Sequence, residues 1–223
     1  MLVSHRYKFI YLKNRKVAGS SVESVFQKYC LPEGLEGSYS KFEDVVPSHF
    51  SNSGIIAGRL SGYDAAIGWK PHSKADDVLK FLGEDLFYSY FKFSVIRNPF
   101  DKMVSKFWWR SEDCSLVEKQ NDLKYIRDKF SKFVFNGGKS MDWKVHTINN
   151  NPICDFYIKY EDLNNGVAKC FEKIGLKDNY VVPKFKSKTR LSKFKYQDYY
   201  TEDTKEVVEK IYKNEIDFFK YQF

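Results

Sequence analysis

The sequence is poor in cysteine and lacks the spacings in which cysteines usually act together. The 223 residues include four cysteines, and no two of them form a CxxC pair. This pattern argues against a metal cage or a dense disulfide framework and favours reduced thiols. The four are Cys30, Cys114, Cys154 and Cys170. Such usage is typical of a cytoplasmic protein.

Long apolar runs and a leader-like beginning are missing as well. No stretch approaches the roughly 20 apolar residues that a membrane helix requires. The first residues, MLVSHRYKFIYL, carry charges within the apolar stretch and show no small-residue cleavage pattern, unlike a signal peptide. We therefore expect a soluble, cytoplasmic protein without a membrane partner.

An excess of acidic residues is also absent. The 37 Lys and Arg outnumber the 29 Asp and Glu, which gives a net charge of +8. The expected partners are anionic, and nucleic acid, a phosphorylated small molecule, an acidic glycan or a membrane surface would each fit. With 43% hydrophobic and 18% aromatic residues, the composition is that of a folded protein. The length predicts a single domain over residues 1–223.

Strand-like and helix-like segments alternate along the chain. Short apolar runs predict strands at 7–12, 55–57, 91–96 and 156–160. Helical spacing predicts helices at 20–28, 73–83, 100–109, 123–135, 167–174 and 201–214. Ser73 is the expected cap of its helix, and 111–122 is predicted to be a loop. This alternation predicts a three-layer α/β fold with a central parallel sheet flanked by helices.

The loop after the first predicted strand has one glycine where the phosphate loop of nucleotide hydrolases needs two. It reads RKVAGSS from Arg15 to Ser21, with Lys16 before Gly19, whereas that motif has its lysine after the second glycine. Strand, loop and helix still direct N–H groups and the positive helix end at one spot, where an anion can bind. A serine that only caps the helix and a lysine that is only solvated would give the same sequence. An anion-binding loop and an ordinary helix start therefore both stay open here.

A second candidate anion site follows the predicted strand 91–96. The segment VIRNPFDKMVS has Arg97 at the strand end and Ser105 eight residues later, in the next helix. An arginine fork suits a terminal phosphate, and a serine hydroxyl can add a hydrogen bond. A structural ion pair is the alternative for Arg97. Because ligands of open α/β sheets bind at the carboxyl ends of strands, two such sets in one sheet indicate a ligand more strongly than one.

Together, these segments resemble the sulfotransferase family. KVAGSS after a strand resembles its 5'-phosphosulfate loop, and RNPFDKMVS resembles its 3'-phosphate motif. GWKPHSKADDVLKFLG, IKYEDL with CFEKIGL, and the closing YYTEDTKEVVEKIYKNEIDFFKYQF are similar to the carbohydrate sulfotransferase branch. The resemblance runs from residue 7 to residue 223 and is weakest in 31–68 and 110–150.

The resemblance implies a P-loop-like fold and a specific donor. The donor would be 3'-phosphoadenosine 5'-phosphosulfate (PAPS), the product 3'-phosphoadenosine 5'-phosphate (PAP), and no metal would be needed. Lys16 would stabilise the charge that develops on the oxygen between phosphate and sulfuryl group. The residues implied in donor binding are Lys16, Val17, Ala18, Gly19, Ser20, Ser21, Arg97, Ser105, Lys188 and Arg190.

Histidine is scarce, with four in the chain, and the family register assigns the catalytic base to His72. Neutral imidazole can take a proton from an acceptor hydroxyl near pH 7. We expect the positive end of the helix after His72 to disfavour its protonated form. Lys70 would assist, and His49 is the second choice of base.

The segment KFKSKTRLSKFK, residues 184–195, contains no acidic residue. In the family, a basic segment at this place covers the 3'-phosphate side of the donor, which points to Lys188 and Arg190. A solvated loop would give the same pattern, and so would a nucleic-acid surface with Phe185 and Phe194 between the cations.

We therefore expect sulfuryl transfer from PAPS to an acceptor hydroxyl on a carbohydrate, without nucleic acid as a partner. The alternative from another class is a non-enzymatic, basic nucleic-acid-binding protein. A nucleotide kinase is disfavoured because the second glycine and the lysine–serine pair of its phosphate loop are missing. The sequence leaves the acceptor and the oligomeric state open.

Overall fold

A computed structural model describes residues 1–35, 45–46, 48–57, 70–110, 114–177, 180–185 and 190–223. The chain forms two compact units. Unit 1 comprises Met1–Ile96 and Asp142–Phe185, and unit 2 comprises Arg97–Met141 and Lys186–Phe223. In the described ranges, no helix is both long enough and apolar enough to cross a membrane.

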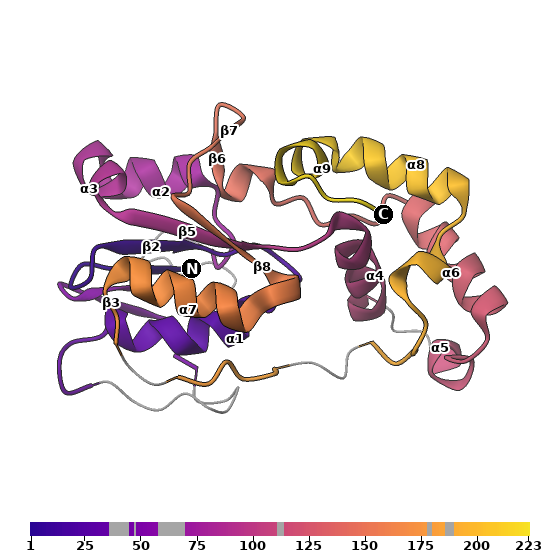
Figure 1. Cartoon of the computed structure of the whole chain (residues 1–223), viewed down its shortest axis with the longest axis horizontal. Coiled ribbons are helices and arrows are strands. Elements are labelled where there is room, and N and C mark those ends of the chain that lie inside the picture. Colours follow the sequence, from indigo (N-terminus) through magenta and orange to yellow (C-terminus); the bar gives the residue numbers. More distant parts are fainter. Residues whose placement is uncertain (36–44, 47, 58–69, 111–113, 178–179, 186–189) are drawn as a thin grey trace. The chain divides into compact units, whose positions relative to one another are not determined.

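Unit 1 is built on a mixed sheet with the strand order β3-β4-β1-β2-β5-β8 (Figure 1). The strands are β1 (Leu2–Ser4), β2 (Phe9–Leu12), β3 (His49–Ser51), β4 (Gly54–Ile56), β5 (Phe91–Ile96) and β8 (Phe156–Lys159), with a separate hairpin of β6 (Thr147–Ile148) and β7 (Asn151–Pro152). β2, β5 and β8 run parallel, as predicted. β1, β4 and β3 add antiparallel pairs. β1 and β3 were not predicted: three residues are too few to show a period, and neither strand is apolar throughout, as the predicted 55–57 is.

Helices cover both faces of this sheet, because β2 directs apolar side chains to both faces. Phe9 and Tyr11 enter one core, and Ile10 and Leu12 enter the other. Successive side chains of a strand point to opposite faces, so a fully apolar strand needs cover on both sides. The covering helices are α1 (Gly19–Phe26) and α7 (Leu163–Ile174) on one side, and α2 (Ala75–Leu82) and α3 (Glu84–Ser89) on the other (Figure 1). The predicted three-layer α/β fold is confirmed.

The start of α2 differs from the predicted one. Its N-cap residue is Lys74, and no side chain among the described residues caps it. Ser73 Oγ instead accepts a hydrogen bond from the Lys70 N–H at 2.9 Å and donates one to the Lys70 carbonyl at 3.0 Å. The prediction of Ser73 as the cap is therefore wrong, because this serine closes the turn before the helix. The end of α2 at Gly83 is confirmed.

Unit 2 is helical in its described part. Its α-helices are α4 (Pro99–Arg110), α5 (Cys114–Glu118), α6 (Leu123–Phe135), α8 (Glu202–Ile211) and α9 (Lys213–Phe219). Its core is aromatic: the rings of Phe107 and Tyr199 flank Phe130 at centroid distances of 5.6 and 5.7 Å. The predicted bounds of α6 are confirmed. The loop prediction for 111–122 is wrong over α5, whose five residues are too few to show an apolar period, and the predicted tail helix is two helices.

Candidate active site

The loop of residues 13–18 begins where β2 ends. Asn14 Nδ2 donates a hydrogen bond to the Val95 carbonyl of the parallel strand β5 at 3.0 Å. The buried carboxylate of Asp142 accepts bonds from the Arg15 backbone N–H at 3.1 Å and from Arg15 Nη1 at 3.0 Å. The first residues of the loop are thus fixed both by β5 and by a carboxylate that lies 127 residues away in the sequence.

The backbone of this loop is strained. Lys16 has a φ of 60°, and Ala18 has a φ of 59° with a ψ of 29°, a region that residues with a Cβ rarely adopt. Left-handed residues in a turn direct successive N–H groups into a concavity that suits an anion. Ala18 is also the N-cap of α1, and within the described part of the chain no side chain caps this helix. The loop therefore has the form of an anion-binding helix start.

Gly19 is required by the packing beneath the loop. A Cβ at this position would lie 2.9 Å from Lys13 Cε and 3.1 Å from Lys13 Cγ. The Lys13 side chain passes Gly19 and reaches Glu23, one helical turn further along α1, where Nζ and Oε2 are 2.5 Å apart. Both charged side chains are buried. Any larger residue at position 19 would displace this lysine.

The two serines of the loop have different surroundings. Ser21 is buried, and its Oγ accepts a hydrogen bond from the Phe185 N–H at 3.3 Å. A hydroxyl that accepts one bond still has a hydrogen to donate. Ser20 is partly buried in the first turn of α1. The reading of Ser20 as a mere helix cap is wrong, because Ala18 occupies the cap position.

His72 lies against the start of the same loop. Its Nδ1 is 2.8 Å from the carbonyl oxygen of Lys13, which is 59 residues away in the sequence. Because a carbonyl oxygen only accepts, Nδ1 carries the hydrogen and Nε2 carries the lone pair. A basic Nε2 is what proton abstraction from a hydroxyl needs. The fold therefore brings the predicted base to the predicted anion loop.

The pKa of His72 is lowered to about 4. Burial is the main cause, and the positive charges of Lys13, Arg15 and the Met1 α-amino group act in the same direction, against the hydrogen bond to the Lys13 carbonyl. The imidazole is therefore neutral near pH 7. The sequence predicts this direction, but it assigns the effect to the helix start, whereas burial is the principal cause.

The other candidates near His72 are placed less favourably. His49 lies on β3, the outer strand of the sheet, and its Nε2 is 3.0 Å from Ser51 Oγ. β4 and β1 separate β3 from β2, where the loop starts. Lys70 is exposed in the turn closed by Ser73. The geometry thus favours His72 over His49 as the base.

A buried neutral His72 predicts a fold that is sensitive to acid. Its folded pKa of about 4 lies below the ordinary 6.5, so the unfolded chain binds the proton first and stability falls as the pH drops from 6.5 to 4. Over this interval the free energy of unfolding of the wild type should fall by about 3 kcal/mol more than that of His72→Asn, whose side chain does not titrate. Urea unfolding at both ends of the interval measures the difference. Equal losses would show that His72 is not buried in its neutral form.

Unit 2 contains the second predicted anion site. Arg97, the first residue after β5, pairs with Asp101 on α4: Nε and Nη2 lie 2.8 and 2.7 Å from Oδ2. Asp101 Oδ1 in turn pairs with Arg190 Nη1 at 3.0 Å. One carboxylate thus holds two guanidinium groups, and the set keeps a net positive charge. Because a guanidinium has five N–H donors, this pairing is compatible with a phosphate contact.

Ser105 lies on the same face of α4 as Asp101, since the two are one helical turn apart. Arg97, Asp101, Ser105 and Arg190 are therefore brought together within unit 2. The sequence prediction missed Asp101, although its spacing of four residues from Arg97 was a signal for an ion pair. Lys188, the other residue predicted here, lies outside the described residues.

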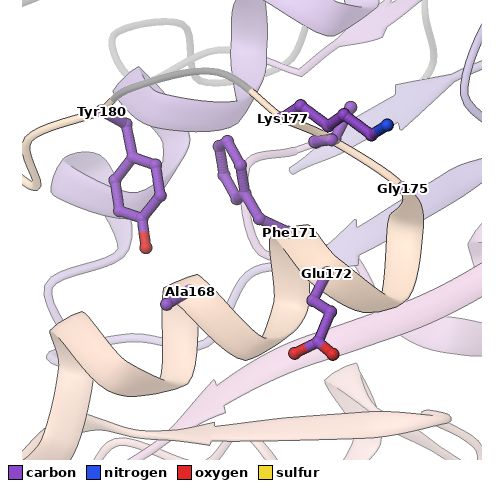
Figure 2. Close-up of a pocket in the computed structure, with 7 residues that line it drawn as sticks. Ala168, Phe171, Glu172, Gly175, Lys177 and Tyr180 are labelled. Atoms are coloured by element: carbon purple, nitrogen blue, oxygen red, sulfur yellow. The ribbon is translucent and has the colours of Figure 1, made fainter.

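Two hollows lie away from the predicted residues. One, of about 370 Å³, is lined by α7 and the segment after it. Figure 2 shows the rings of Phe171 and Tyr180 next to each other in its wall, with centroids 4.3 Å apart. Another, of about 480 Å³, lies along α6 and includes Arg127 and Thr201. Across the described ranges, no group of three or more His, Cys, Asp or Glu side chains is placed to hold a metal ion.

The comparison with known families agrees with this geometry. The model of the sulfotransferase family matches residues 1–222. The chain belongs to the sulfotransferase family. The match covers the chain segments of both units, and membership makes this sulfotransferase an enzyme that transfers a sulfuryl group. No curated protein and no solved structure matches the chain.

Proposed function

We propose that this sulfotransferase transfers the sulfuryl group of PAPS to a hydroxyl group of a carbohydrate. One observation carries the proposal: the strained loop before α1 and the neutral imidazole of His72 are joined through the Lys13 carbonyl. The backbone N–H groups and Lys16 suit a phosphosulfate group, and His72 suits activation of a hydroxyl. Family membership supports this reaction.

In the proposed reaction, His72 Nε2 takes the proton of the acceptor hydroxyl while the hydroxyl oxygen bonds to sulfur. The bond between sulfur and the bridging oxygen breaks, and its electron pair stays on that oxygen. Lys16 stabilises the negative charge of the departing PAP. The proton, the sulfuryl group and the electron pair are all accounted for, so direct transfer needs no covalent enzyme intermediate and no metal.

The donor-binding residues divide into two sets. The backbone of Val17, Ala18 and Gly19 and the hydroxyls of Ser20 and Ser21 bind the phosphosulfate together with Lys16. Arg97, Ser105 and Arg190, together with Lys188, bind the 3'-phosphate. The carbohydrate acceptor and the cytoplasmic location stay predictions from the sequence. The alternative of a nucleic-acid-binding protein receives no support from the family match.

Calorimetric titration with PAP tests the choice of donor. We expect saturable binding of PAP by the wild type and much weaker binding of adenosine 5'-phosphate, which lacks the 3'-phosphate. Equal affinity for the two nucleotides would contradict the assignment. Binding of DNA or RNA with a steep salt dependence, without binding of either nucleotide, would also contradict it.

Arg97→Ala should raise the Kd of PAP about 10- to 100-fold, because a hydrogen bond to a charged group contributes about 1.5–3 kcal/mol. Ser105→Ala should act in the same direction with a smaller effect. Neither change should alter the affinity for adenosine 5'-phosphate. Arg110→Ala, exposed at the other end of α4, is the matched control. Calorimetry on the three variants checks these expectations. An equal loss of affinity for both nucleotides in Arg97→Ala would refute the role of Arg97 in binding the 3'-phosphate.

A further inference from the structure

We infer that the buried Lys13–Glu23 pair is a positioning element, which holds the anion loop and His72 in one catalytic geometry. The inference rests on the proposed function. Neither residue is assigned to the chemistry itself: Lys13 is the first residue of the loop, and Glu23 lies on α1. Three contacts of Lys13 connect the pair to the site.

Each contact of Lys13 reaches a different part of the site. Its Nζ pairs with Glu23 Oε2 at 2.5 Å on the second turn of α1. Its carbonyl accepts the hydrogen bond from His72 Nδ1 at 2.8 Å. Its methylene groups occupy the space where a Cβ of residue 19 would lie. One residue therefore touches the first turn of α1, the second turn of α1 and the base.

The pair also closes the loop at its base. Lys13 directly follows β2, and Gly19 and Glu23 follow the loop, so the lysine side chain connects the two ends of the segment that contains Lys16. If α1 moved relative to β2, the left-handed residues Lys16 and Ala18 would change conformation. The ion pair restricts this movement.

Stability alone gives little reason for such a pair. Side-chain exposure is 5% for Lys13 and 0% for Glu23, and a buried ion pair is seldom more stabilising than apolar residues of the same volume. Burial acts to raise the pKa of Glu23, but Lys13 and the Met1 α-amino group outweigh it, so the pKa is lowered and the carboxylate is charged. What the pair does provide is a fixed orientation of the Lys13 side chain relative to α1.

The test removes the pair but keeps an acceptor for the buried Met1 α-amino group, which donates a hydrogen bond to Glu23 Oε1 at 2.8 Å. The amide oxygen of Glu23→Gln can accept that bond, and burial lowers the pKa of the amino group to about 6, so it can lose its charge. Lys13→Met/Glu23→Gln keeps the side-chain volumes, and Lys92→Met/Asp155→Asn removes another lysine pair of unit 1, with 3.4 Å between Nζ and Oδ2. We expect the first double variant to lose about 10- to 100-fold in kcat, the usual effect of a small misplacement, with a smaller change in the Kd of PAP. The control should keep its kcat. Equal losses in kcat for the two double variants would overturn the inference.

A second readout does not depend on turnover. Nitrogen chemical shifts of His72, assigned through His72→Asn, report which ring nitrogen carries the hydrogen. The wild type should show the Nδ1–H form alone, and Lys13→Met/Glu23→Gln should show a mixture with the Nε2–H form. Identical spectra of the wild type and the double variant would overturn the positioning role, whether or not the wild type transfers sulfuryl groups. Absence of transfer by the wild type would instead count against the proposed function.

Discussion

Lys16→Ala is expected to lower kcat about 100- to 1000-fold while the protein stays folded. Lys16 is assigned to the oxygen on which charge develops as the sulfuryl group leaves, and the loss of one such group typically costs this much. Its backbone, with a φ of 60°, belongs to the strained loop and lies two residues before Ala18, the N-cap of α1. Steady-state kinetics at saturating donor measure the effect, and thermal unfolding confirms the fold.

Lys8→Ala is the matched control for this substitution. Lys8 is exposed in the turn before β2 and has a φ of 52°, so alanine meets the same backbone strain there. It lies at the opposite end of β2 from the loop. Turnover of Lys8→Ala should match that of the wild type. Normal turnover in Lys16→Ala, or the same loss in both variants, would remove Lys16 from the mechanism.

His72→Ala is expected to lower the rate of transfer about 100- to 10,000-fold, the usual contribution of a general base, and to keep PAP binding. Because burial lowers the pKa of His72 to about 4, kcat/KM of the wild type should stay level from pH 7 to about pH 5 and fall below that. The sign follows from the role: a base acts in its unprotonated form, so protonation at acid pH removes activity.

His72→Asn separates chemistry from structure at this position. Its amide can still donate to the Lys13 carbonyl, as Nδ1 does, but it has no counterpart of the basic Nε2. The proposal requires it to be as inactive as His72→Ala. Activity near that of the wild type would mean that His72 only supports the loop, and a severe loss in His49→Ala would then give the role to His49.

The sequence predicts the parallel half of the sheet well because its signals are local. β5 has four apolar residues, Phe91, Phe93, Val95 and Ile96, within six, and α6 has apolar residues at helical spacing with Asp122 as a side-chain cap. Both elements have their predicted bounds. β1 and α5 have three and five residues, so neither shows a period, and their structure depends on contacts made elsewhere in the chain.

In the candidate site too, local signals are predictable from the sequence and long-range contacts are not. Motif spacing makes Lys16, Arg97 and Ser105 candidates, since each belongs to a short segment with a recognisable order. The groups that fix the site come from distant positions: Asp142 holds Arg15 across 127 residues, and the Lys13 carbonyl holds His72. No local pattern predicts such contacts, because they depend on how β2, α1 and the turn before α2 pack together.

Transfer of radiolabelled sulfuryl from PAPS to a panel of anionic and neutral glycans tests the central claim most directly. The proposed function predicts that at least one glycan becomes labelled and that PAP forms in an equal amount. Lys16→Ala should give almost no labelled glycan under the same conditions. Release of the label only as free sulfate, or no consumption of PAPS with any glycan, would contradict the proposed function.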